Sequence, residues 1–113
     1  MSQSTDPGFR IEVESTDGRQ TIMLLGELDL AVAAEVEETL SGAVRSDAGQ
    51  IVLDISKLTF IDSTGVSVLV ATMKRDGVGE RFRVKPPQAD AVRRVLALTG
   101  LEERLPYVDD GRP

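Results

Sequence analysis

The segment Ile51–Ser56, with the sequence IVLDIS, limits the possible folds of this chain more than any other part of it. It is almost continuously apolar and rich in β-branched residues. This pattern is typical of a strand that is covered on both faces, as in the middle of a parallel or mixed sheet. Since helices usually provide that cover, the segment predicts an α/β fold with this strand inside the sheet.

Strand-like and helix-like patterns alternate on both sides of this segment. Residues 9–15 alternate apolar with polar side chains, and a turn sequence at 16–19 leads into a second strand at 20–28, which predicts a hairpin. From Leu30 to about Arg45, apolar residues recur every three or four positions, as on one face of a helix that starts at Leu30 itself. Asp29 is well placed to cap this helix.

The second half of the chain continues the alternation. The pattern predicts a helix from Val66, a short strand at 81–85, a helix that ends before Gly100, and a short last strand within 101–108. The expected order is therefore β-β-α-β-α-β-α-β. It indicates a single α/β domain, in which a mixed four- to five-stranded β-sheet has helices packed mainly on one face.

The length of 113 residues fits one domain. We expect this domain to cover residues 9–108. Residues 1–8 are polar and predict a flexible N-terminal tail, and residues 109–113 predict a polar C-terminal tail.

Composition excludes several classes of function. The chain has no histidine and no cysteine. This excludes disulfides, thiolate chemistry, the usual zinc, copper and haem ligands, and a Ser-His-Asp triad within the chain. The formal net charge of −6 disfavours nucleic acid and anionic membrane surfaces as partners. No apolar run is long enough to span a bilayer, and the N-terminus lacks the pattern of a secretory signal, so we expect a cytoplasmic protein.

One short motif carries most of the functional information. Asp62, Ser63, Thr64 and Gly65 lie between the buried strand and the following apolar helix. Asp, Ser and Thr are common helix caps, so capping alone is one explanation. A phosphorylated serine is another, because the N–H groups and partial positive charge of a helix N-terminus stabilise phosphate. An aspartic protease motif would have one residue fewer before the glycine, and a serine hydrolase would need a base that the chain lacks.

Three sequence blocks together resemble a STAS domain, and in particular the small, free-standing anti-sigma factor antagonists of bacteria. They are GELD at 26–29, IVLDISKLTFIDSTGVSVLV at 51–70, and VRRVLALTGLEERLPY at 92–107. The DSTG sequence alone has little specificity, but the order and spacing of the three blocks have much more. The resemblance extends over nearly the whole chain, from about residue 9 to residue 108.

The resemblance implies roles for individual residues. Ser63 matches the serine that is phosphorylated in this family, and Asp62, Thr64 and Gly65 match the rest of its loop. Asp29 matches an acid that is implicated in engaging the partner kinase, although a plain helix cap explains this residue equally well. If the strands that precede Asp29 and Asp62 are neighbours, both loops open on the same edge of the sheet.

The implied function is binding without chemistry of its own. In the unphosphorylated state such a protein binds an anti-sigma factor that is a serine kinase, and thereby releases a sigma factor. Phosphorylation of Ser63 ends the interaction, and a separate serine phosphatase reverses it. ATP and Mg²⁺ belong to the kinase, so no cofactor or metal is expected in this chain. The alternative is a STAS-domain regulatory or scaffold subunit of a transporter or of a stress-signalling complex.

Overall fold

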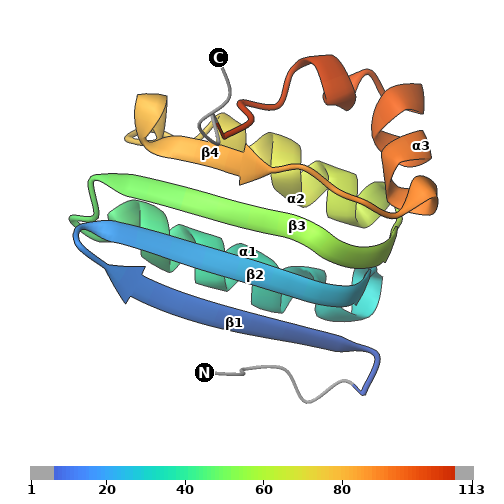
Figure 1. Cartoon of the computed structure of the whole chain (residues 1–113), viewed down its shortest axis with the longest axis horizontal. Coiled ribbons are helices and arrows are strands. Elements are labelled where there is room, and N and C mark those ends of the chain that lie inside the picture. The colour runs from blue at the N-terminus through green and yellow to red at the C-terminus, as the bar shows by residue number, and fades with distance from the viewer. Residues whose placement is uncertain (1–6, 109–113) are drawn as a thin grey trace.

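The strands of the protein form one mixed sheet in the order β1-β2-β3-β4, as seen in a computed structural model that describes residues 7–108 (Figure 1). The strands are β1 (Phe9–Thr16), β2 (Arg19–Leu28), β3 (Gln50–Ile61) and β4 (Phe82–Lys85). β1 and β2 form the expected antiparallel hairpin, whereas β2 pairs parallel with β3 and β3 parallel with β4. The IVLDIS segment thus lies in an internal strand, as its composition predicts.

Helices connect the parallel strands and cover one face of the sheet. α1 (Leu30–Arg45) links β2 to β3, and α2 (Ser63–Met73) leads from β3 towards β4. Both lie behind the sheet in the view of Figure 1, and α3 (Asp90–Leu98) lies at the end where β3 finishes. Two short 3₁₀ helices, η1 (Gly79–Arg81) and η2 (Leu101–Glu103), complete the order. Within residues 7–108, no helix is long and apolar enough to cross a membrane.

The core lies between the sheet and this helix layer. Alternate residues of β3 point into it, and Ile51, Leu53 and Ile55 are completely buried. They pack in one cluster with side chains of α1 such as Val36 and Leu40. Aliphatic side chains make up nearly all of this cluster, as expected from the 4% of aromatic residues in the chain. The α/β fold with helices mainly on one face is therefore confirmed.

The burial of the first residue of α1 and the start of α2 differ from the sequence prediction. The apolar face of α1 was expected to include Leu30, but the side chain of Leu30 is 73% exposed. Burial on α1 begins only at Val32, because Leu30 lies in the first turn, separated from the end of β2 by Asp29 alone. α2 begins at Ser63, before the predicted start at Val66, because Asp62 caps the helix from the position directly before Ser63.

The C-terminal part of the domain forms a smaller structure than the predicted last strand. A single parallel bridge joins Val84 to Tyr107, so the sheet of the described residues has four strands. Gly100 ends α3 with a left-handed φ of 76°, which agrees with its predicted role as a helix stop. Residues 1–6 of the expected N-terminal tail and the whole of the expected tail 109–113 lie outside the described residues.

Candidate functional site

The parallel pairing of β2 and β3 brings Asp29 and Asp62 to the same edge of the sheet. Leu28 and Ile61, the last residues of the two strands, are partners in the register. The backbone N–H of Asp62 donates a hydrogen bond to the carbonyl oxygen of Leu28 at 3.2 Å. The two acids therefore follow neighbouring strand ends, and the loops that carry them open side by side.

Each of these two acids caps a helix. Oδ1 of Asp29 accepts a hydrogen bond from the backbone N–H of Ala31 at 3.0 Å. Oδ1 of Asp62 accepts one from the N–H of Gly65, also at 3.0 Å. Both side chains are half-buried. These bonds satisfy N–H groups that have no partner inside the helix, and the negative charges are favourable at these helix ends. Capping is thus part of the role of both residues, and within residues 7–108 the other oxygen of each carboxylate accepts no hydrogen bond.

Ser63 occupies the first position of α2 and is exposed. Because Asp62 caps the helix, the Ser63 hydroxyl is not needed for that purpose, and it makes no hydrogen bond within residues 7–108. The carbonyl oxygen of Ser63 accepts a bond from Oγ of Ser67 at 3.0 Å, one turn later. The neighbouring Thr64 is half-buried. Of the two hydroxyls in the motif, that of Ser63 is therefore the more accessible.

Gly65 is buried because α2 starts directly over the ends of β2 and β3. A Cβ atom at this position would lie 2.7 Å from Cγ1 of Ile61 and 2.8 Å from Cγ of Leu28. It would also lie 3.1 Å from the carbonyl oxygen of Leu28. Only glycine allows this close approach. The four residues of the motif thus cap the helix, expose one hydroxyl and bring the helix start against the sheet.

Two large apolar side chains flank the motif on the surface. Leu30 follows Asp29 directly and is 73% exposed, and Phe60 precedes Asp62 by two residues and is 43% exposed. Sequence reasoning missed both as surface residues. Helical spacing alone assigned Leu30 to the core, and Phe60 belongs to a strand in which most large apolar residues are buried. The sequence nevertheless contained an indication that Leu30 is exposed, since it is the first residue after the cap Asp29 and precedes the buried face of the helix.

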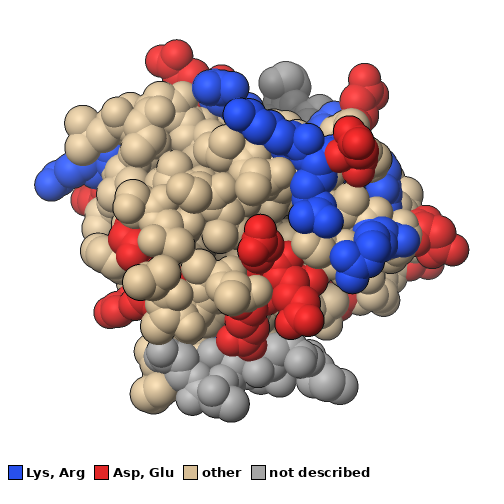
Figure 2. All heavy atoms as spheres, turned by 180° about the vertical axis from the view of Figure 1, so that it is seen from behind, with Lys and Arg blue, Asp and Glu red and all other residues tan. Residues whose placement is uncertain are grey.

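The surface of α2 and of the first turn of α1, behind the two capping acids, is poor in charge. Figure 2 shows the helix-covered face of the molecule, in which a broad area carries no charged side chain. α2 contains no charged residue between Ser63 and Met73, and neither does the first turn of α1. In a chain with a net charge of −6, such a neutral area next to exposed Leu30 and Phe60 is suited to contact with another protein.

Comparison with known proteins gives a family match over most of the chain. The family model described as "Mlab, STAS domain" matches residues 11–107. This range contains the whole candidate site and all elements except the first two residues of β1.

The similar proteins share one kind of name. The anti-sigma-F factor antagonist RsfB of Mycobacterium tuberculosis is 29% identical over 100 residues, which cover 88% of this chain and 81% of that protein. The anti-sigma-B factor antagonist of Staphylococcus aureus is 27% identical over 103 residues, covering 91% and 94%. A crystal structure of an anti-sigma factor antagonist from Mycobacterium paratuberculosis superposes with a TM-score of 0.80 at 28% identity, covering 96% and 92%. All three are named as anti-sigma factor antagonists, in agreement with the expectation that this chain is not an enzyme.

Proposed function

The chain belongs to the STAS domain family, and from this premise we propose that it is an anti-sigma factor antagonist. The observation that carries the proposal is the similarity, over nearly the full length of each chain, to proteins that are named for this role. In this role the protein binds an anti-sigma factor and so releases a sigma factor. The uncharged surface of α2, together with the exposed side chains of Leu30 and Phe60, supports protein binding at this edge of the sheet.

The proposed partner is an anti-sigma factor that is also a serine kinase and uses ATP and Mg²⁺. Ser63 is the proposed acceptor of the phosphate. Its hydroxyl is exposed at the first position of α2 and makes no hydrogen bond within residues 7–108, so the γ-phosphate of a bound nucleotide can approach it. The N–H groups at the start of α2 stabilise the added phosphate within the free protein.

Phosphorylation of Ser63 changes the binding surface in a way that weakens the binding of the partner. It adds about −1.5 to −2 charges at neutral pH, next to the carboxylates of Asp62 and Asp29. A partner surface shaped for a small hydroxyl then meets a bulky dianion. A differential affinity of about 2–3 kcal/mol corresponds to roughly 30- to 150-fold weaker binding, which is enough to release the partner. A separate serine phosphatase removes the phosphate, and the proteins involved meet in the cytoplasm.

Variants of Ser63 test the proposal. The protein is incubated with ATP and a cognate kinase, and the modified peptide is identified by mass spectrometry. We expect the phosphate on Ser63. Ser63→Ala is expected to bind the unmodified partner normally and to resist release by ATP, and Ser63→Asp is expected to bind more weakly. Phosphate on Thr64 with Ser63 unmodified would contradict the assignment.

A pull-down with the unphosphorylated protein tests the wider role. The proposal expects an anti-sigma factor kinase in the bound fraction and its loss after phosphorylation. Recovery of a transporter or of a stress-signalling scaffold, with no kinase present, would instead support the role of a STAS-domain regulatory subunit.

A further inference from the structure

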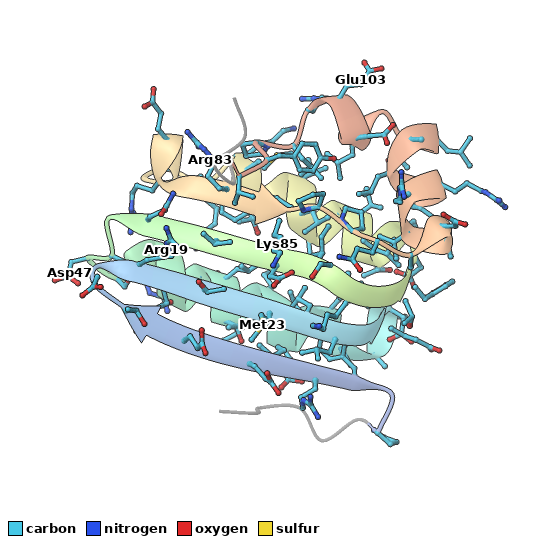
Figure 3. The ribbon with its side chains drawn as sticks, viewed as in Figure 1. Arg19, Met23, Asp47, Arg83, Lys85 and Glu103 are labelled. Atoms are coloured by element: carbon cyan, nitrogen blue, oxygen red, sulfur yellow. The ribbon has the colours of Figure 1, made fainter. Side chains whose placement is uncertain are left out.

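The sheet face opposite to the helices contains a hollow of about 430 Å³. In Figure 3 this face is turned towards the viewer, and Arg19, Met23 and Lys85 are labelled on it. The hollow crosses all four strands and reaches the segment after η2. Its lining residues are Glu14, Arg19, Thr21, Met23, Gln50, Val52, Asp54, Lys85 and Val108. It lies on the far side of the sheet from α1 and α2, so the proposed binding surface around Ser63 does not use it.

Asp54 is the most unusual residue of this lining. It lies in the middle of β3 and is only 6% exposed. The backbone N–H of Ser56 and its hydroxyl both donate to Oδ1 of Asp54, at 2.9 and 2.7 Å. Within residues 7–108, Oδ2 has no such donor, and Asp54 forms no ion pair. Among the described residues, no buried side-chain oxygen or nitrogen lacks a hydrogen-bond partner, so Oδ2 is accessible from the hollow, where it can accept hydrogen bonds from an ammonium group.

Lys85 lies beside Asp54 and provides the opposite charge for a ligand. The two residues are register partners on the parallel strands β3 and β4, which are about 4.8 Å apart in a sheet. The ammonium group of Lys85 is exposed and forms no ion pair in the described part of the chain. We propose that the hollow binds a free α-amino acid, with its ammonium group at Asp54 and its α-carboxylate at Lys85.

The rest of the lining selects the side chain of that amino acid. Met23, Val52 and Thr21 form a mainly apolar floor next to Asp54. At the far end, Nε of Arg19 donates to Oε1 of Gln50 at 3.0 Å, which fixes the guanidinium group and leaves its other N–H groups for a ligand. Arg19 and Gln50 are register partners. Gln50 and Asp54 are four residues apart on β3, or about 13 Å, so the guanidinium group acts on a ligand held at Asp54 mainly through its positive charge, which also offsets the negative charge of Glu14 in the lining. An acidic α-amino acid can use this charge, and L-glutamate is the probe of choice.

Amide NMR spectra of the whole chain during a titration with L-glutamate test the proposal. The expected shifts are at Thr21, Met23, Val52, Asp54 and Lys85, with a dissociation constant of about 1 mM or tighter. Glutarate has both carboxylates but no ammonium group, and it is expected to bind at least about tenfold more weakly. No shift with L-glutamate at about 10 mM, or equal shifts with glutarate, would overturn the proposal, since equal shifts mean that anions merely collect near Arg19 and Lys85.

Asp54→Asn is the decisive variant. The amide oxygen of asparagine can still accept the two bonds from Ser56, so the strand is retained while the negative charge is lost. We expect at least tenfold weaker binding of L-glutamate. Asp90→Asn removes one negative charge from the exposed first turn of α3 and is expected to change nothing. Should Asp54→Asn unfold, Lys85→Gln removes the carboxylate partner from an exposed position. Unchanged affinity in a folded variant at either residue refutes the site.

Discussion

Gly65 is the residue at which the candidate site depends most directly on packing. The Cβ atom of an alanine would lie 2.7 Å from Cγ1 of Ile61 and 2.8 Å from Cγ of Leu28. These side chains belong to the core and have little room to move. We expect Gly65→Ala to lower the free energy of unfolding by about 1–3 kcal/mol, the usual cost of overpacking. Urea unfolding followed by circular dichroism measures this change.

Gly42 is the matched control for this substitution. It also lies in a helix, it is exposed, and a Cβ atom there would meet nothing within 4 Å. Alanine is favoured over glycine in a helix interior, so Gly42→Ala is expected to raise the free energy of unfolding by about 0.5–1 kcal/mol. Equal effects of the two substitutions would show that helix propensity, and not the contact with the strand ends, explains Gly65.

Asp29 caps α1 and is also proposed to contact the partner, and the substitution Asp29→Asn distinguishes these two roles. Asn caps helices about as well as Asp, so Asp29→Asn is expected to keep the bond to the N–H of Ala31 and the melting temperature. Loss of one partner of a buried interfacial charge pair costs about 2–5 kcal/mol, and a pair at the rim costs far less. If the charge contacts a cation of the kinase, binding weakens by about tenfold or more.

Both quantities are measured on the same Asp29→Asn sample, by thermal melting and by titration with the kinase. Unchanged values for both would reduce Asp29 to a helix cap and remove it from the binding surface. A lower melting temperature would show that asparagine does not replace the cap, and Asp29→Ser would then provide a second uncharged cap.

At the scale of helices and strands, sequence patterns located most elements but not the accessible side chains at their ends. The cap at Asp29 and the apolar spacing gave both bounds of α1 correctly. The same spacing misplaced Leu30, since periodicity describes the direction of a side chain and not how far the sheet extends beneath it. The bonds from the guanidinium group of Arg81 to the carbonyl oxygens of Val44, Ser46 and Ala48 were also beyond prediction, because they join segments far apart in sequence.

Exposed apolar side chains at the start of α1 and near the end of β3 allow a test at this scale. Leu30→Ser removes a largely exposed side chain and is expected to change the free energy of unfolding by less than about 0.5 kcal/mol, whereas Phe60→Ser removes one that is more than half buried and is expected to lower it by about 1 kcal/mol. If both residues contact the kinase, each substitution weakens binding by about 1–2 kcal/mol, or roughly 5- to 30-fold. Calorimetric titration with the kinase measures this loss.

Leu98 provides the control for these two substitutions. Its side chain is 80% exposed and belongs to the last residue of α3, outside the motif and the loop of Asp29. Leu98→Ser is expected to leave both stability and kinase binding unchanged. If it weakens binding as much as Leu30→Ser does, the partner contacts a wider surface than the edge around Ser63.

At the scale of the whole molecule, the alternation of patterns predicted the class of fold, and the pairing of strands decided the site. Continuous apolar character placed β3 inside the sheet, but nothing local to the sequence fixed the register of Leu28 with Ile61. That register makes Asp29 and Asp62 neighbours. The hollow at Asp54 was hidden for the same reason, since its lining comes from four strands and the segment after η2, and a single acid in an apolar strand does not identify its neighbours.

Tyr107, in the C-terminal segment, makes the free energy of unfolding depend on pH in the alkaline range. The N–H of Val84 donates to the carbonyl oxygen of Pro106, and the N–H of Val108 donates to that of Val84, each at 2.9 Å. Tyr107 lies between these bonds, and burial, with a smaller contribution from the charge of Glu102, raises the pKa of its hydroxyl above the usual 10.0. The folded state therefore retains this proton when the unfolded chain has already lost it. The contribution of the Tyr107 hydroxyl to the stability of the folded state is complete below about pH 10 and decreases as the pH rises through its raised pKa.

Tyr107→Phe removes this titration while keeping the ring. Lysines and other groups also lose protons in this range. The informative quantity is therefore the difference in unfolding free energy between the native protein and the Tyr107→Phe variant. Between about pH 9 and 12, we expect the unfolding free energy of the native sequence to fall more steeply than that of Tyr107→Phe, as measured by urea unfolding at each pH. Parallel curves would mean that the hydroxyl of Tyr107 has the same proton affinity in both states. The decline at alkaline pH would then come from the growing negative charge of the whole chain, which starts at −6 at pH 7.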